Sequence, residues 1–279
     1  MQTHVYQKET NLNLIKLLKQ SLKDLDESRF LAFQLAKRDI TAQYRQSYLG
    51  VLWAFIPPLT TALVWMLLDS SGTIELSQSG VPYPVYVFSG TLLWSIITDS
   101  ISYPIINTNA AKSILTKINF PKEALITSGI LKLLFFSVIK VILLLIFVFV
   151  YGVGFNMSLL LFPLAILGSL IVGTTIGLLL TPLGMLYEDI GKLITFGMQI
   201  LMYATPVLFV MPKTGFIKTI MEINPLTPII VVGRNLAVGL PVEYLGYFLI
   251  TLLVCTPLFF VALVFYRISI PIFIERLSA

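Results

Sequence analysis

Residues 126–151 read ITSGILKLLFFSVIKVILLLIFVFVY, and this almost wholly apolar run decides the fold class. Only Lys132 and Lys140 interrupt it with charge. A helix rises about 1.5 Å per residue, so the run is long enough to cross the roughly 30 Å hydrocarbon core of a bilayer. The stretch therefore predicts a membrane-spanning helix. We expect Lys132 to extend toward the inner membrane surface and the deeper Lys140 to face a protein interior.

The rest of the chain has the same apolar character. Of its 279 residues 57% are hydrophobic and 12% are charged, about half the charged fraction of a soluble domain. Pro57 and Pro58 are expected to kink or restart the first apolar stretch, and Pro182 to break the inner end of the fourth. The sequence predicts an all-α membrane protein with six transmembrane helices, at about residues 50–68, 84–103, 126–151, 159–186, 194–211 and 245–266.

The distribution of Lys and Arg predicts the topology. With six spans, both ends of the chain lie on one side of the membrane. Placing them in the cytoplasm leaves 14 Lys and Arg inside and three outside, in accord with the positive-inside rule. We therefore expect a cytoplasmic tail and interfacial helix at 1–49, a transmembrane domain at 50–268 and a cytoplasmic tail at 269–279. The formal net charge of +5 then indicates orientation and not nucleic-acid binding.

An amphipathic helix is expected at residues 29–45. Its charges are too many for a bilayer crossing, which favours a helix lying in the cytoplasmic interface. The alternative is a helix docked on another domain. The apolar positions that recur at helical spacing are Phe30, Phe33, Ala36, Ile40 and Tyr44, and those that share the opposite face are Gln34, Arg38, Thr41 and Arg45.

Two long connections also carry information. The loop 104–125 ends in Asn119-Phe120-Pro121 and is longer than a bare connector requires, which favours a docking element over a loop that merely lies on the membrane. Segment 212–243 holds two apolar stretches, 215–223 and 226–238, each too short to cross. They predict an outer re-entrant hairpin, which survives only where it is buried in protein or faces a water-filled path.

The residues needed for catalysis are largely absent. The only histidine, His4, is in the N-terminal tail, and the only cysteine, Cys255, lies in an apolar run. No phosphate-binding loop surrounds the Gly191-Lys192 pair. We therefore expect no enzyme, no metal site and no cofactor in this chain. Asp99 lies within a span, but no mid-membrane charge pair and no internal repeat is apparent, which argues against an ion-driven secondary transporter.

Aromatic residues are frequent near the predicted span ends. Most fit an interfacial belt. Some are candidates for lining a path for sugars, whose apolar ring faces stack on aromatic rings, and these channel aromatics are Trp65, Tyr86 and Trp94.

Three motifs are informative together. Residues 37–54 read KRDITAQYRQSYLGVLWA, residues 115–121 read LTKINFP, and residues 223–226 read INPL with Arg234 following. Over residues 29–270 the chain resembles the ABC-2 polysaccharide-export permeases, which handle O-antigen, teichoic acid and capsule. The resemblance implies the transmembrane subunit of an ATP-driven exporter of lipid-linked polysaccharide, located in the bacterial cytoplasmic (inner) membrane.

The resemblance also implies partners. Such permeases are homodimers that bind two copies of a cytoplasmic ATP-binding subunit, which holds ATP and Mg. By the same analogy, segment 108–121 is the coupling helix, 29–45 the gate helix and 212–243 the outer gate. Alternatives are an ABC-2 permease for a drug or other small molecule, a secondary transporter and a membrane enzyme acting on lipid-linked sugars.

The implied site residues fall into three groups. Those coupling to the ATPase are Leu115, Lys117, Asn119, Phe120 and Pro121. Those of the gate helix and its headgroup site are Arg38, Tyr44, Arg45, Ser47 and Trp53. Those of the outer re-entrant gate are Asn224, Pro225 and Arg234.

Overall fold

The computed structural model describes residues 13–45, 47–72, 80–118 and 120–278, apart from the side chains at 51, 54, 58, 62, 65, 69 and 275–278. Throughout these ranges the secondary structure is helical, with no β-strand, as the all-α prediction requires. The helices are α1 (Leu14–Glu27), α2 (Arg29–Tyr44), α3 (Ile56–Ser70), α4 (Tyr83–Ala110), α5 (Lys112–Leu115), α6 (Glu123–Val150), α7 (Phe162–Leu186), α8 (Asp189–Tyr203), α9 (Phe216–Ile223), α10 (Thr227–Val238) and α11 (Leu245–Ser278), with short 3-10 helices η1 (Gly50–Ala54) and η2 (Met157–Leu161).

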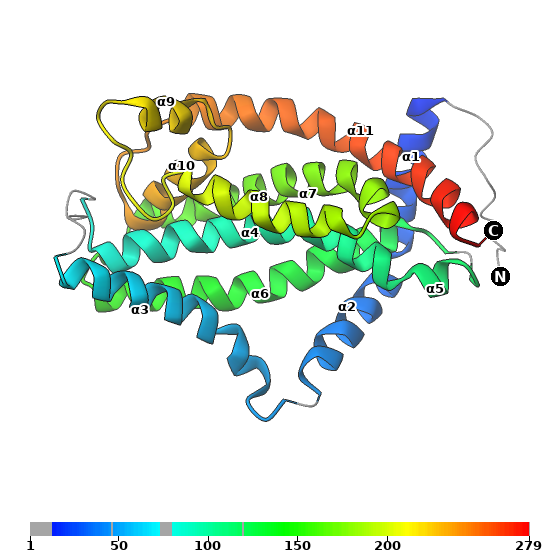
Figure 1. Ribbon diagram of the computed structural model, residues 1–279, viewed down its shortest axis with the longest axis horizontal. Coiled ribbons are helices and arrows are strands. Elements are labelled where there is room, and N and C mark those ends of the chain that lie inside the picture. Colours follow the sequence, from blue (N-terminus) through cyan, green and yellow to red (C-terminus); the bar gives the residue numbers. More distant parts are fainter. Residues whose placement is uncertain (1–12, 46, 73–79, 119, 279) are drawn as a thin grey trace.

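The long helices run along one axis of the molecule (Figure 1). Helices α4, α6, α7, α8 and α11 follow this axis, and α2 and α3 form a V beside α6. Helices α9 and α10 lie at one end, which we call the α9 end. Helices α1 and α5 lie at the opposite end, which we call the α5 end.

Membrane-spanning length is reached by four helical segments within the described ranges. They are Tyr83–Ala110, Glu123–Val150, Met157–Leu186 and Leu245–Ile274, and the α9–α10 pair, bent by 85°, is a fifth if it is counted as one span. Helices α3 and α8 have 15 residues each, which gives about 22 Å against a core of about 30 Å. The first and fifth predicted spans are therefore not confirmed at full length.

The ends of three helices differ from what the sequence indicated. Helix α4 continues through Pro104 to Ala110, so the connection to α6 is shorter than the predicted loop 104–125. Helix α7 passes through Pro182 without a break, and α11 includes most of the predicted tail 269–279. A proline in a membrane helix need not end it, because neighbouring helices restrain the backbone and no water solvates an opened turn.

Close packing places α4 at the centre of the bundle, between α6 and α7. Two glycines of α7 permit this approach. A Cβ atom added to Gly177 would lie 2.5 Å from the carbonyl oxygen of Ile101, and one added to Gly173 would lie 2.5 Å from Cβ of Ser100. Small residues at such interfaces let helix backbones approach and gain van der Waals contact in the absence of a hydrophobic driving force.

An ion cluster joins three helices at the α5 end. Nη1 of Arg267, on α11, lies 2.6 Å from Oδ2 of Asp24 on α1 and 2.7 Å from Oε1 of Glu123 on α6. Ser21 donates a hydrogen bond of 2.7 Å to the same Glu123 oxygen. Glu123 also lies in the first turn of α6, where the helix dipole favours a negative charge. The cluster fixes α1 against the bundle.

Substitution of Gly177 by Ala tests the α4–α7 packing. The new methyl group meets a backbone carbonyl that no side-chain rotation can move, so we expect a loss of about 1–3 kcal/mol of stability. Gly197 on α8 has nothing within 4 Å of its Cβ position, so Gly197→Ala is the matched control and should be neutral or stabilising. The readout is the thermal unfolding midpoint in detergent; equal midpoints for the two variants would contradict the packing role of Gly177.

Candidate functional site

The helix that begins at Asp189 ends at Tyr203, eight residues before the predicted end of the fifth span at 211. Residues 204–209 form turns, although Thr205 and Val207 are fully buried and Leu208 is 1% exposed. Buried backbone without helical hydrogen bonds needs other partners. The sequence shows an unbroken apolar stretch here, so the break could not be predicted from hydropathy.

Side chains from three other elements bind the carbonyl groups of this break. Tyr83 donates to the Leu208 oxygen at 2.8 Å and Tyr86 to the Phe209 oxygen at 3.1 Å. Asn224, between α9 and α10, donates to the Ala204 oxygen at 3.1 Å, and Arg234 of α10 donates to the Val207 oxygen at 2.8 Å. We call these four residues, Tyr83, Tyr86, Asn224 and Arg234, the carbonyl clamp.

Arg234 is the buried charge of the clamp, with 2% of its surface exposed. Its Nε also donates to the Tyr86 carbonyl at 3.2 Å, and its guanidinium carbon lies 3.5 Å from the centre of the Tyr86 ring. A side chain at Gly90 would overlap the guanidinium. The carbonyl dipoles and the ring face compensate the charge in place of a carboxylate.

The residues predicted for the outer gate thus meet the end of α8. Asn224 also accepts a hydrogen bond from the Leu226 amide at 2.9 Å, which closes the turn between α9 and α10. Pro225 lies in this turn, at the 85° bend. The structure brings Asn224 and Arg234 together on one buried stretch of backbone, and their role in gating stays a prediction.

Two of the three predicted channel aromatics, Tyr86 and Trp94, are core residues. Tyr86 and Trp94 are 5% and 6% exposed, and Tyr86 belongs to the clamp. The side chain of Trp65 lies outside the described residues. A lining role for these rings stays a prediction.

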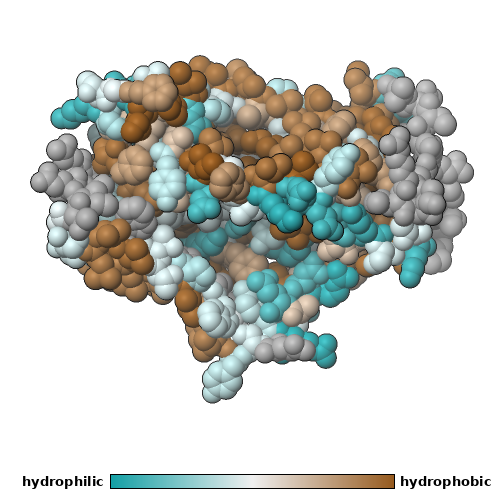
Figure 2. Space-filling view, in the orientation of Figure 1, coloured by the Kyte–Doolittle hydropathy of each residue, from teal (hydrophilic) through white to brown (hydrophobic). Residues whose placement is uncertain are grey.

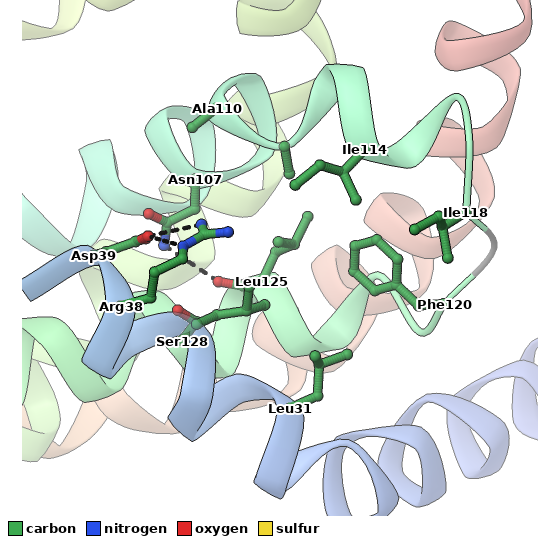
Figure 3. Close-up of a pocket in the computed structure, with 12 residues that line it drawn as sticks. Leu31, Arg38, Asp39, Asn107, Ala110, Ile114, Ile118, Phe120, Leu125 and Ser128 are labelled. Atoms are coloured by element: carbon green, nitrogen blue, oxygen red, sulfur yellow. Dashed lines mark hydrogen bonds and ion pairs between the residues drawn. The ribbon is translucent and has the colours of Figure 1, made fainter. Parts of the chain in front are cut away.

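A second site lies between α2, α4, α5 and α6, where a cavity of about 250 Å³ separates the predicted gate helix from the predicted coupling segment (Figure 3). Arg38 and Asp39 are at one side of the cavity, and Ile118 and Phe120 are at the other. Its remaining lining residues are Leu31, Leu35, Asn107, Ala110, Ala111, Ile114, Leu125 and Ser128.

A polar junction closes one side of the cavity. Lys132 donates to Oδ2 of Asp39 at 2.9 Å and also to Asn107, while Arg38 donates to Oδ1 of Asp39 at 2.7 Å. Burial raises the pKa of Asp39, but its contacts with Lys132 and Arg38 outweigh this and leave the pKa below its ordinary value. Lys132 thus pairs with a carboxylate of the predicted interfacial helix α2, and its extension toward the inner membrane surface stays a prediction.

The predicted coupling helix 108–121 is not one helix. It consists of the end of α4, the four-residue α5 and a loop. Leu115 is buried at 8%, and Phe120 and Pro121 are half-buried. Lys117 is exposed, and Ile118 is 60% exposed. Asn119 lies outside the described residues.

The predicted gate helix packs on α6 through small side chains, and its placement in the membrane interface stays a prediction. Ala32 and Ala36 are its buried residues, whereas Phe30 and Phe33 are 72% and 54% exposed, because only small side chains permit close approach to α6. The other predicted positions are half-buried or exposed: Tyr44 packs edge-on against Phe136, Arg45 is exposed, Ser47 accepts a hydrogen bond from the Gly50 amide and Trp53 is 51% exposed.

A charge pair lies midway along the bundle, contrary to the sequence analysis. Nζ of Lys140 lies 3.4 Å from Oδ2 of Asp99 and 2.9 Å from Oγ of Ser95. The prediction that Lys140 faces a protein interior is confirmed. The pair joins residues 41 positions apart on different helices, so no local spacing reveals it. The lack of a mid-membrane charge pair is therefore no longer an argument against a secondary transporter.

The comparisons with known proteins decide the class. A family model described as "ABC-2 type transporter" matches residues 31–237. The chain belongs to the ABC-2 transporter family. The resemblance drawn from the three motifs is thus confirmed at the level of the family, and the apolar helices make this ABC-2 chain a multi-pass membrane component of a transporter.

Two relatives cover most of the ABC-2 chain. The O-antigen export system permease protein RfbA of Myxococcus xanthus is 28% identical over 188 residues, which is 67% of this chain and 71% of the relative. A protein of the same name from Klebsiella pneumoniae is 25% identical over 231 residues, which is 80% of this chain and 86% of the relative.

Replacement of Arg234 by Lys tests the carbonyl clamp. Lysine keeps the charge but lacks the planar fork that reaches two carbonyls, and each buried carbonyl left without a donor costs about 1–3 kcal/mol. We expect Arg234→Lys to lower the thermal unfolding midpoint in detergent. Lys218→Arg is the control, because Lys218 is partly exposed on α9 and pairs only at 3.5 Å with Glu222. A clamp variant as stable as the control would refute the structural role of the guanidinium.

Proposed function

We propose that the chain is the transmembrane subunit of an ATP-driven exporter that moves a lipid-linked polysaccharide of the O-antigen type across the bacterial inner membrane. The observation that carries the proposal is the similarity to two O-antigen export permeases over 67% and 80% of the chain. It favours a sugar polymer over the alternative cargo of an ABC-2 permease, a drug or other small molecule.

The proposed topology has six crossings with both termini in the cytoplasm. Helices η1 and α3 together cover residues 50–70 except Phe55, which is long enough to cross. The turns after α8 extend the fifth crossing, and the carbonyl clamp supplies the hydrogen bonds that helical backbone would otherwise make. The 85° bend between α9 and α10 supports a re-entrant hairpin on the outer side. The α5 end then faces the cytoplasm.

The energy source in this proposal is a separate subunit. Two copies of the chain form a homodimer, and each binds a cytoplasmic ATP-binding subunit that holds ATP and Mg. The loop after α5 is a suitable docking element, because half-buried Phe120 anchors it against the cavity, Lys117 is exposed, and Ile118 is 60% exposed at the edge of the cavity that it lines. Membership of the ABC-2 family supports the partnership.

The headgroup of the lipid carrier is proposed to bind near Arg38 and Arg45. The side chain of Arg38 is 58% exposed beside the apolar lining of the cavity. A guanidinium next to an apolar surface suits a pyrophosphate attached to a lipid chain. Attraction of these arginines to ordinary anionic lipid is the competing explanation.

Deletion of the gene tests the proposed function. In a strain that makes the polymer, we expect loss of surface polymer and accumulation of lipid-linked polymer inside the cell, with recovery when the gene is restored. The purified chain should carry the ATP-binding subunit with it. Unchanged surface polymer in the deletion strain would overturn the proposed cargo.

A charge at Ile118 tests the docking surface. Ile118→Asp should abolish polymer-stimulated ATP hydrolysis and weaken co-purification of the ATP-binding subunit, because a buried carboxylate in the contact would lack a partner. Phe216→Asp, at a 79% exposed position on α9, is the control at the opposite end. If the α9 variant loses the ATP-binding subunit and the Ile118 variant retains it, the docking end and the proposed topology are both wrong.

A further inference from the structure

Over residues 85–102, the residues of helix α4 that are not buried are all polar, and they form one stripe. Between Val85 and Ser102 all but five residues of the helix are buried. The positions that are not buried are Thr91, Ser95, Thr98, Asp99 and Ser102. Their spacing of three and four residues places them on one face of the helix.

This face does not suit lipid. On the neighbouring α6, the exposed positions Leu134, Val138, Ile142 and Ile146 are all apolar, as contact with hydrocarbon requires. A carboxylate in hydrocarbon is costly, and charged residues within membrane segments face protein or water-filled space. The α4 stripe therefore borders a polar space. Figure 2 shows hydrophilic residues gathered across the middle of the face that carries α8 and α2, between hydrophobic areas.

A cavity lies beside this stripe. It has a volume of about 280 Å³ and is lined by Pro57, Thr61, Phe88, Thr91, Leu92, Ser95 and Lys140. This is near the lower limit of roughly 300–1,000 Å³ for ligand pockets, which suits one small ring. The Lys140 ammonium reaches the cavity from α6, and its partner Asp99 is 40% exposed.

We propose that Asp99, Lys140, Thr91 and Ser95 form a sugar-binding subsite on the translocation path of the exporter. This inference rests on the proposed function. The carboxylate of Asp99 accepts hydrogen bonds from sugar hydroxyls, and the ammonium of Lys140 donates to them. The two charges neutralise each other, so the subsite selects a neutral hydroxylated ligand and exerts little attraction on a free ion.

The hydroxyl groups of the stripe complete the subsite as acceptors. Thr91 donates its proton to the Val87 carbonyl at 2.9 Å, and Ser95 donates to the Leu92 carbonyl at 2.7 Å. Their protons are therefore satisfied within α4 when no ligand is bound. The Thr91 oxygen accepts from a passing hydroxyl, and the Ser95 oxygen, which already accepts from Lys140, does so through its second lone pair. Several weak contacts of this kind let a polymer enter and leave, as conduction through a pore requires.

The first test is cysteine labelling in a Cys255→Ala background. Ser95→Cys is compared with Val138→Cys, a 58% exposed apolar position two residues from Lys140. The anionic reagent methanethiosulfonate ethylsulfonate reacts with thiolate, which forms in water and not in hydrocarbon. We expect Ser95→Cys to react at least about tenfold faster, since each unit of pKa increase lowers the thiolate fraction tenfold. We expect this rate to fall when cells make the polymer.

The second test is export by Asp99→Asn and Lys140→Met variants that still bind the ATP-binding subunit. We expect several-fold less surface polymer from each. If Ser95→Cys is unreactive, or cross-links to a second copy, the stripe is covered by protein and the subsite is refuted. Polymer-insensitive labelling together with normal export by both variants also refutes it. If the unmodified chain does not restore surface polymer to the deletion strain, the proposed function is wrong, whatever the labelling pattern.

Discussion

The hydrogen bonds from Arg234 to the carbonyl groups of Val207 and Tyr86 maintain a non-helical backbone segment inside an apolar bundle. Buried carbonyls left without a donor cost about 1–3 kcal/mol each, and a buried guanidinium without partners costs more. Each group therefore needs the other. Because Arg234 is on α10 and Tyr86 is on α4, the same contact holds the bent α9–α10 pair against the central helix and lets α8 end early.

Helix α4 connects this contact to the rest of the molecule. Its 28 residues extend about 42 Å, and close packing against α6 and α7 keeps it rigid. Gly90 near one end accommodates Arg234, Asp99 meets Lys140 midway, and Asn107 binds Lys132 just before α5. One packed helix, which ends at Ala110 next to α5, therefore connects the α5 end with the polar stripe and the carbonyl clamp.

The sequence predicts the elements better than their ends. The run 126–151 coincides with one helix, α6, except for its last residue, because apolar length alone decides a crossing. The ends at Ala110, Tyr203 and Ser278 were missed, since proline within a packed membrane helix does not act as it does in water, and since the break after Tyr203 depends on donors from α4 and α10. The polar contacts of Lys132 and Lys140 were missed for a similar reason. Their partners lie on other helices, so the spacing of residues within one helix does not indicate them.

The charged side chains within the bundle differ in how much of their surface stays exposed. Arg267 and Glu123 are 13% and 1% exposed, and Arg234 is 2% exposed, so these groups are fully used in holding helices together. Asp99 differs, because 40% of its side chain remains accessible although it already has a cationic partner. A carboxylate kept open at mid-bundle is costly if it faces lipid, and its exposure is explained if the face beside it is wet. In the proposed exporter, the polar character of the α4 stripe suits a hydroxylated cargo beside it, while the pairing of Asp99 with Lys140 also joins α4 to α6.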